Sequence, residues 1–226
     1  MVTPESSNPH EPPGLVGDAG MKPATEPPAD NVTERRRLVA LAGHVGDGQA
    51  ARTGLSDQAP SVRTSALGAL DRLGLLSDDD LARALADPSA SVRRRACELT
   101  SVRAGVPMAT MLDDVDPSVV EMAAWALGER RERAAVSALS SLASAASGHA
   151  DPLCREAAVA ALGAIGDPAG LTAILGALDD KPAIRRRAAV ALAAFEGPAV
   201  DAALRRCLDD RDWQVRQVAE DLLSVE

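Results

Sequence analysis

Residues 178–195, LDDKPAIRRRAAVALAAF, carry a pattern that recurs along most of the chain. An acidic residue precedes a proline, an aliphatic–arginine pair follows, and alanine and leucine stand four and eight residues after the aliphatic residue. Six copies follow one another at intervals of 27 to 35 residues, with the aliphatic position at Val62, Val92, Val119, Cys154, Ile184 and Val215. Such a period is typical of a solenoid, in which each unit packs on its neighbours.

When the six copies are aligned, two further positions, here called columns, indicate the structure that each copy forms. The residue four positions after the aliphatic residue is always alanine: Ala66, Ala96, Ala123, Ala158, Ala188 and Ala219. The residue eight positions after it is leucine in five copies and Thr100 in the second copy. Residues i, i+4 and i+8 share one face of a helix, so each copy predicts an amphipathic helix. The alanine column predicts a close helix crossing that has no room for a larger side chain.

These columns resemble the HEAT-like repeats, in the short bacterial form that is also found in phycobilin lyases. The resemblance extends over residues 57–226 and implies an all-α, right-handed α-solenoid of about six or seven helical hairpins. In that family, aspartate and arginine form a ladder from repeat to repeat. The resemblance implies this role for Asp57, Arg63, Asp87, Arg93, Asp179, Arg185, Asp210 and Arg216. Val120 stands in the arginine column of the third copy and interrupts the predicted ladder.

Composition divides the chain into a tail and a repeat domain. Residues 1–31 hold 7 of the 15 prolines and few large apolar residues, which predicts a disordered tail. We expect a repeat domain over residues 32–226. Within it, residues 32–55 form a degenerate capping repeat, residues 56–211 form the regular repeats, and residues 212–226 form a C-terminal capping helix.

Charge and residue usage narrow the classes of function. The net charge of −9 argues against general binding to a phosphate backbone. Cys97, Cys154 and Cys207 lack metal-ligand spacing and suit small buried residues, as expected in a reducing cytoplasm. The first residues lack the features of a secretory signal, and no apolar run predicts a membrane span. The arginine-rich composition suggests a bacterial source. We expect no metal and no cofactor.

The third copy departs most from its own template. Met122 and Trp125 stand where the other copies have small, charged or aliphatic residues, and they lie beside Val120. An aromatic residue with a methionine neighbour on a peripheral helix face is typical of a protein-binding hot spot. The sequence therefore predicts partner binding at Met122, Trp125 and Val120. The alternative is that Trp125 packs beneath a second helix at residues 133–146.

Three other functions remain open. The resemblance to phycobilin lyases suggests a bilin-attaching enzyme as an alternative to a non-enzymatic scaffold. Deoxyhypusine hydroxylase also has HEAT-like repeats, but its metal-binding His-Glu pairs are missing here, because the one such pair, His10-Glu11, lies in the tail. Arginine runs at residues 93–95 and 185–187 suggest nucleic-acid binding, which the acidic composition disfavours. A scaffold that binds a protein partner on its concave face or at the Met/Trp patch therefore ranks first, as a monomer or as a weak dimer through its C-terminal helix.

Overall fold

The computed structural model describes residues 31–224, and this part of the chain contains helices and loops but no strands. The predicted tail lies, apart from Asn31, outside the described residues. The elements in chain order are α1 (Val32–Val45), α2 (Gly48–Gly54), α3 (Pro60–Arg72), α4 (Asp78–Leu85), α5 (Ala90–Thr100), η1 (Ala109–Asp113), α6 (Pro117–Glu129), η2 (Arg133–Ala135), α7 (Val136–Ala143), α8 (Pro152–Ile165), η3 (Pro168–Gly170), α9 (Leu171–Ala177), α10 (Pro182–Ala191), η4 (Leu192–Ala194), α11 (Pro198–Cys207) and α12 (Trp213–Leu223).

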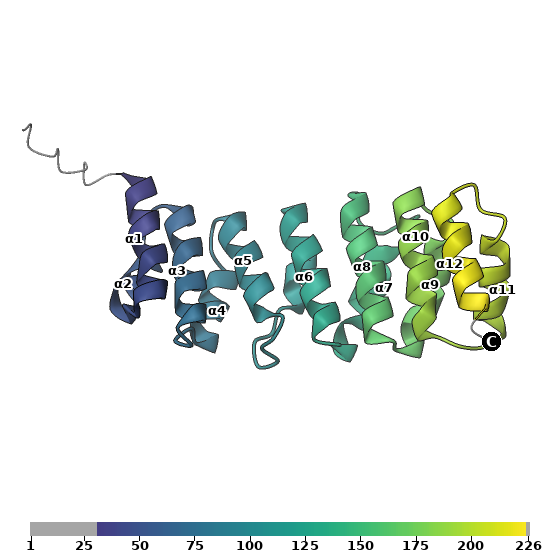
Figure 1. Ribbon diagram of the computed structural model, residues 1–226, viewed down its shortest axis with the longest axis horizontal. Coiled ribbons are helices and arrows are strands. Elements are labelled where there is room, and N and C mark those ends of the chain that lie inside the picture. The colour runs from purple at the N-terminus through teal and green to yellow at the C-terminus, as the bar shows by residue number, and fades with distance from the viewer. Residues whose placement is uncertain (1–30, 225–226) are drawn as a thin grey trace, which may run out of the picture. The chain divides into compact units, whose positions relative to one another are not determined.

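The helices form two layers in the unit that begins at Val32. Neighbouring members of the first layer, α1, α3, α5, α6, α8, α10 and α12, pack against each other in chain order (Figure 1). The remaining helices pack against this row from one side. The described residues therefore form six helical hairpins followed by α12, which confirms the predicted all-α solenoid.

Local sequence explains where the first-layer helices begin. Proline occupies the first turn of α3, α6, α8 and α10, where a missing backbone N–H leaves no hydrogen bond unmade. Aspartate side chains cap three helices of this layer, α6, α8 and α12. The side chain of Asp116, for example, accepts a hydrogen bond from the backbone N–H of Ser118 at 2.9 Å. The recurring pattern of an acidic residue followed by proline therefore marks where these helices begin.

The alanine column lies at the centre of the core. The six alanines have no exposed surface, as expected of residues at a close helix crossing: Ala66, Ala96, Ala123, Ala158, Ala188 and Ala219. Thr100 is buried where the other copies have leucine. Its hydroxyl donates a 2.7 Å hydrogen bond to the carbonyl oxygen of Ala96, so this polar group is satisfied inside the helix.

A glycine–alanine contact brings three pairs of first-layer helices close together. A Cβ atom added to Gly128 on α6 would lie 2.8 Å from the Cα atom of Ala161 on α8. Gly43 meets Ala69 at 2.7 Å, and Gly163 meets the Cβ atom of Ala191 at the same distance. Each glycine stands nine residues after its copy's aliphatic position, or after Glu34 in the first repeat. The repeat therefore carries a second small-residue column that the sequence reading missed.

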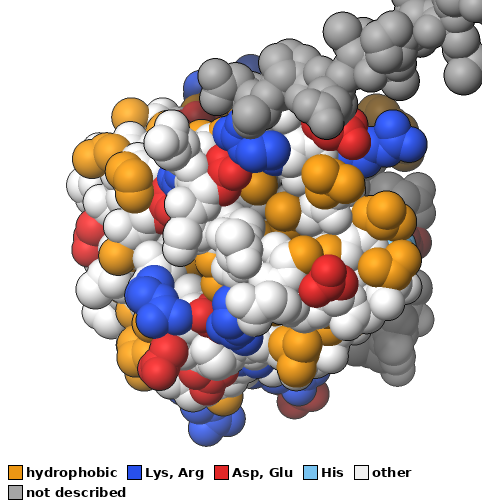
Figure 2. Space-filling view, turned by 90° about the vertical axis from the view of Figure 1, so that its left-hand side faces the viewer, with side chains coloured by type: hydrophobic (Ala, Val, Ile, Leu, Met, Phe, Trp, Pro, Cys, Tyr) orange, Lys and Arg blue, Asp and Glu red, His pale blue; other side chains and the backbone are white. Residues whose placement is uncertain are grey.

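The α1 end of this unit presents apolar side chains to solvent. Leu38, Leu41 and Val45 lie on one face of α1 and are each more than half exposed. Figure 2 views this end and shows hydrophobic side chains interspersed with charged ones. The first repeat thus carries a more apolar outer face than its predicted capping role requires.

Candidate functional site

A series of arginine–aspartate ion pairs connects successive repeats. Each arginine forms two parallel hydrogen bonds to the carboxylate, and the ion-pair distances are 2.6 to 2.8 Å. The pairs are Arg35–Asp57, Arg63–Asp87, Arg93–Asp114, Arg155–Asp180 and Arg185–Asp210. We call this series the ladder.

Four of the ladder arginines each join two loops: Arg63, Arg93, Arg155 and Arg185. In addition to its bonds to the next repeat, Arg63 donates from Nη1 to the carbonyl oxygen of Asp57 at 2.8 Å. Arg93 does the same to Asp87 at 2.9 Å. The hydrogen bond from Arg93 holds the pKa of Asp114 below its ordinary value. The charged groups of the ladder are therefore paired with one another and bonded to backbone, which indicates a structural role in connecting repeats.

The structure corrects the expected ladder at two positions. The acceptor for Arg155 is Asp180, whereas Asp179 projects outward with 71% of its side chain exposed, 3.6 Å from Arg206. The loop before α10 places its aspartate two residues before the proline, instead of the three seen before α3 and α6, which moves the ladder position to Asp180. Arg216 bonds the carbonyl oxygen of Asp210 at 2.7 Å, and no following repeat in the described chain offers it a carboxylate.

Sequence reasoning also missed members of the ladder. Arg35 stands 28 residues before Arg63, which is within the observed range of repeat intervals, and this spacing could have identified it. The degenerate first repeat hid it, because Glu34 replaces the aliphatic residue of the pattern.

The ladder is interrupted between α6 and α8. Val120 occupies the arginine position and is fully buried. His149 occupies the aspartate position, and its Nδ1 accepts a hydrogen bond from the backbone N–H of Asp151 at 3.0 Å. In the ladder, Asp57 makes the equivalent bond to Ala59 at 2.8 Å. His149 thus preserves the loop geometry without supplying a carboxylate to the preceding repeat.

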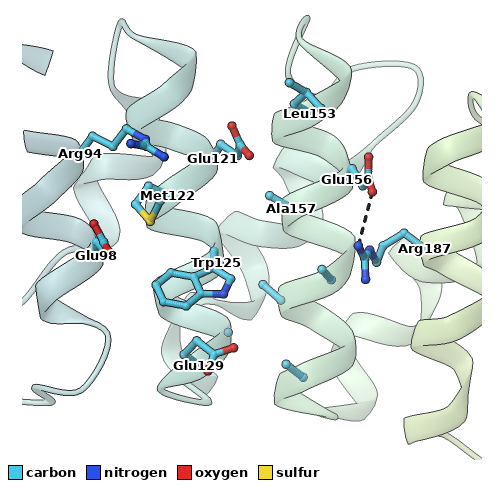
Figure 3. Close-up of a pocket in the computed structure, with 14 residues that line it drawn as sticks. Arg94, Glu98, Glu121, Met122, Trp125, Glu129, Leu153, Glu156, Ala157 and Arg187 are labelled. Atoms are coloured by element: carbon cyan, nitrogen blue, oxygen red, sulfur yellow. Dashed lines mark ion pairs between the residues drawn. The ribbon is translucent and has the colours of Figure 1, made fainter. Parts of the chain in front are cut away.

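A groove of about 670 Å³ lies across the faces of α6 and α8, the two helices between which the ladder is interrupted. Met122 and Trp125 border it on α6, and Leu153 borders it on α8 (Figure 3). Trp125 is 42% exposed, so the alternative in which it is buried beneath residues 133–146 is wrong. Val120 is also corrected as a contact residue, because a fully buried side chain presents no surface to a partner.

The groove has a small-residue floor and a charged rim. Ala157, Ala160 and Ala164 of α8 contribute to the floor, where short side chains leave the helix surface open. Figure 3 shows the charged side chains at the edges of this surface. They are Arg94, Glu98, Glu121, Glu129, Glu156 and Arg187. Carboxylates therefore outnumber guanidinium groups by four to two.

The other reactive side chains of the described chain do not form a site. All three cysteines are buried, and burial raises the pKa of the Cys97 thiol to about 12 and that of the Cys154 thiol to about 11. Residues 31–224 contain no group of three or more histidine, cysteine or acidic side chains that could hold a metal ion. None of their helices has the length and apolar character that a membrane crossing requires.

Comparison with known proteins identifies the type of repeat. A family model described as HEAT repeats matches residues 139–224. No curated protein matches the chain. The crystal structure of YibA from Escherichia coli is similar with a TM-score of 0.58 and 17% identity, over 86% of this chain and 76% of that one. A designed armadillo repeat protein in complex with the peptide (KR)4 has a TM-score of 0.56 and 20% identity, over 84% of this chain and 97% of that one.

A structure of human deoxyhypusine hydroxylase in complex with glycerol has a TM-score of 0.44 and 22% identity, over 87% of this chain and 80% of that one. The stronger structural similarities are to helical repeat proteins that differ widely in sequence from this chain. The comparisons agree with the observed architecture: the chain is a helical repeat solenoid whose residues 139–224 match HEAT repeats.

Proposed function

We propose that this protein is a non-enzymatic scaffold that binds an extended segment of a protein partner in the groove over α6 and α8. The observation that carries the proposal is the exposure of Trp125 beside Met122 and above the alanine floor. Tryptophan is enriched among the residues that dominate binding energy at protein interfaces. The alanines leave room for the backbone of a bound segment to approach the helix.

Two further observations support a protein ligand. The four rim carboxylates would repel a phosphate backbone, which disfavours nucleic acid at this place. The designed armadillo protein holds a peptide on a fold of similar type. The proposal rests on the local side chains, since one fold serves many functions.

Affinity capture from the source organism, with the full chain as bait, tests the proposal. We expect wild type to capture a partner that the variant Trp125→Glu loses. Trp213→Glu is the matched control, because Trp213 is also exposed but lies at the start of α12, away from the groove. The captured protein is then purified, and its affinity for each variant is measured by calorimetry.

A role for Trp125 predicts that Trp125→Glu weakens binding at least about thirtyfold, which corresponds to ~2 kcal/mol, while Trp213→Glu changes it less than about twofold. Circular dichroism of both variants verifies that they fold. Equal binding of the purified partner by wild type and Trp125→Glu would contradict the proposal.

We also propose that the repeats are of the short type found in phycobilin lyases, because their intervals are as short as 27 residues. A bilin-attaching activity would require a bound tetrapyrrole. Visible absorbance of the protein purified from its source would therefore favour the enzyme over the scaffold.

For the oligomeric state, we propose a monomer or a weak dimer through α12, where Val218 is only partly buried against the core. Val225, seven residues after Val218, lies outside the described residues. Sedimentation equilibrium over a concentration series tests this expectation.

A further inference from the structure

We infer that the bound segment carries an arginine or lysine side chain that stacks on Trp125 next to Glu129. This inference rests on the proposed function and names the chemistry of the partner. Its basis is the distribution of charge along the groove, which differs between the two ends.

The Trp125 end of the groove is acidic. Trp125 and Glu129 are four residues apart on α6 and therefore neighbours on the helix surface. Figure 3 shows Glu129 below the indole ring and Glu98 of α5 across from it. Glu129 forms no ion pair with any residue in the described part of the chain, and Glu98 pairs with Arg95 of its own helix at 2.7 Å. The carboxylate of Glu129 thus remains available to a ligand.

Apart from Arg95, which pairs with Glu98, the arginines near this end leave Glu129 without an ion pair in the described part of the chain. Arg130 follows Glu129, but its guanidinium donates to the carbonyl oxygens of Val106 and Ala104 and pairs with Glu132 at 2.9 Å. Arg187 faces Glu156 at 3.6 Å on the far side of the groove. Figure 3 shows Arg94 at the level of Glu121, toward the opposite end of the groove.

Two more features favour a cation at this position. Glu129 is the last residue of α6, where the helix dipole places partial negative charge. The face of an indole ring attracts cations through its quadrupole, and arginine and lysine are the side chains that use this interaction. An acidic side chain would meet repulsion from the carboxylate of Glu129. A neutral one would leave the Glu129 carboxylate without a partner.

The floor restricts the neighbours of the basic residue. Ala157, Ala160 and Ala164 allow the backbone of the segment to lie close to α8, and Met122 and Leu153 offer apolar contacts beyond the indole. The chemistry that fits is therefore an extended peptide with a basic residue flanked by small or aliphatic residues.

Selection from a random 12-residue peptide library on the immobilised full chain tests the inference. Peptides that also bind the variant Trp125→Ala are removed, and the remaining peptides are synthesised for calorimetry. We expect arginine and lysine to be enriched among them. Replacing the selected arginine by glutamine in the peptide is expected to weaken binding about tenfold.

Variants of the protein separate a local site from general attraction to an acidic surface. We expect Trp125→Ala to weaken binding about tenfold or more, and Glu129→Gln about three- to tenfold. The controls are Trp213→Ala and Glu196→Gln, which remove an exposed indole and an exposed carboxylate that do not line the groove. Both are expected to retain affinity within about twofold.

The outcomes distinguish this inference from the proposed function. Selected peptides that depend on Trp125 but are neutral or acidic would overturn the inference and leave peptide binding in place. Basic peptides that bind Trp125→Ala and Glu129→Gln as tightly as wild type would also overturn it. Their binding would then come from general electrostatic attraction to a protein with a net charge of −9. If no peptide depends on Trp125, the inference fails, and capture of the natural partner decides the proposed function separately.

Discussion

The alanine four residues after each aliphatic position has no exposed surface in any of the six copies, so side-chain volume is what these sites limit. We predict that Ala158→Leu lowers the free energy of unfolding by about 1–3 kcal/mol, because the added atoms overpack the core. Urea denaturation measures the change. The same substitution at Ala164, on the exposed face of the same helix, is expected to change stability by less than ~0.5 kcal/mol.

Asp179 and Asp180 are adjacent in sequence but differ in their surroundings. Asp180 is nearly buried and bonded to Arg155, so Asp180→Asn leaves the guanidinium without its charged partner. We predict a loss of about 1–3 kcal/mol for Asp180→Asn in chemical denaturation. Asp179→Asn, at an exposed side chain, is expected to cost less than ~0.5 kcal/mol. Similar losses for the two variants would show that the ladder bond contributes little here.

The Asp80 carboxylate makes the free energy of unfolding depend on pH. Burial would raise its pKa, but hydrogen bonds from Ser77, Arg52 and Arg83 lower it to about 2, against 3.8 without these surroundings. When folding lowers the pKa of a carboxylate, the ionised group stabilises the folded protein at every pH above the pKa of the unfolded state. This stabilisation is lost as the pH falls through the pKa of the folded state. We predict that stability falls between about pH 4 and pH 2.

We expect the stability of Asp80→Asn to depend less on pH than that of wild type. Its free energy of unfolding should be lower by on the order of 1–2 kcal/mol at pH 7 and nearly equal to that of wild type at pH 2. Thermal unfolding at a series of pH values measures both. Asp79→Asn is the control, since Asp79 is exposed in the same helical turn. A parallel fall of wild type and Asp80→Asn would contradict the assignment.

At the scale of the element, the contact between α6 and α8 depends on a missing side chain. Gly128→Ala raises helix propensity by about 1 kcal/mol, yet its Cβ atom would lie 2.8 Å from the backbone of Ala161. We predict a net destabilisation of about 1–3 kcal/mol, because backbone cannot move aside as a flexible side chain does. Differential scanning calorimetry gives the sign. Gly176→Ala, which meets nothing within 4 Å, is expected to be neutral or stabilising.

Most of the helices, but not all of their contacts, could be predicted from the sequence. Proline, the aliphatic residue and alanine recur at fixed offsets, so they revealed the first-layer helices and their buried face. The glycine column was missed because it is present in only some repeats, and because a glycine within a helix reads as a weak position. The exposure of Trp125 was left open, since it depends on how the neighbouring hairpin packs.

Across the whole repeat unit, the ladder consists of two blocks. Three pairs join the repeats up to Asp114 and two join those from Arg155 onward, and the joint between them relies on close packing of α6 and α8. Val120, which replaces the arginine of the repeat, indicated this interruption from the sequence. The substitution of His149 for aspartate was hidden by the longer loop before α8, which shifts the repeat interval to 35 residues.

A double substitution tests whether the missing rung can be restored. We predict that Val120→Arg alone destabilises the protein by about 3 kcal/mol or more, because it buries a charge without a partner. Adding His149→Asp is expected to recover at least about 1 kcal/mol through a new pair of the ladder type. A double-mutant cycle by urea denaturation measures the coupling. Additive effects would show that the loop holds position 149 away from α6.

The double attachment of Arg63, Arg93, Arg155 and Arg185 has a consequence for how the number of repeats can change during evolution. Because these junctions use one arginine and one aspartate in the same geometry, a repeat that begins with the ladder aspartate can form the same bonds to the arginine of another repeat. Loss of residues 87–113 would bring Asp114 next to Arg63, five residues before an aliphatic residue, as Asp87 is now. Unequal recombination within the gene could therefore add or remove whole repeats while each new junction remains chemically complete.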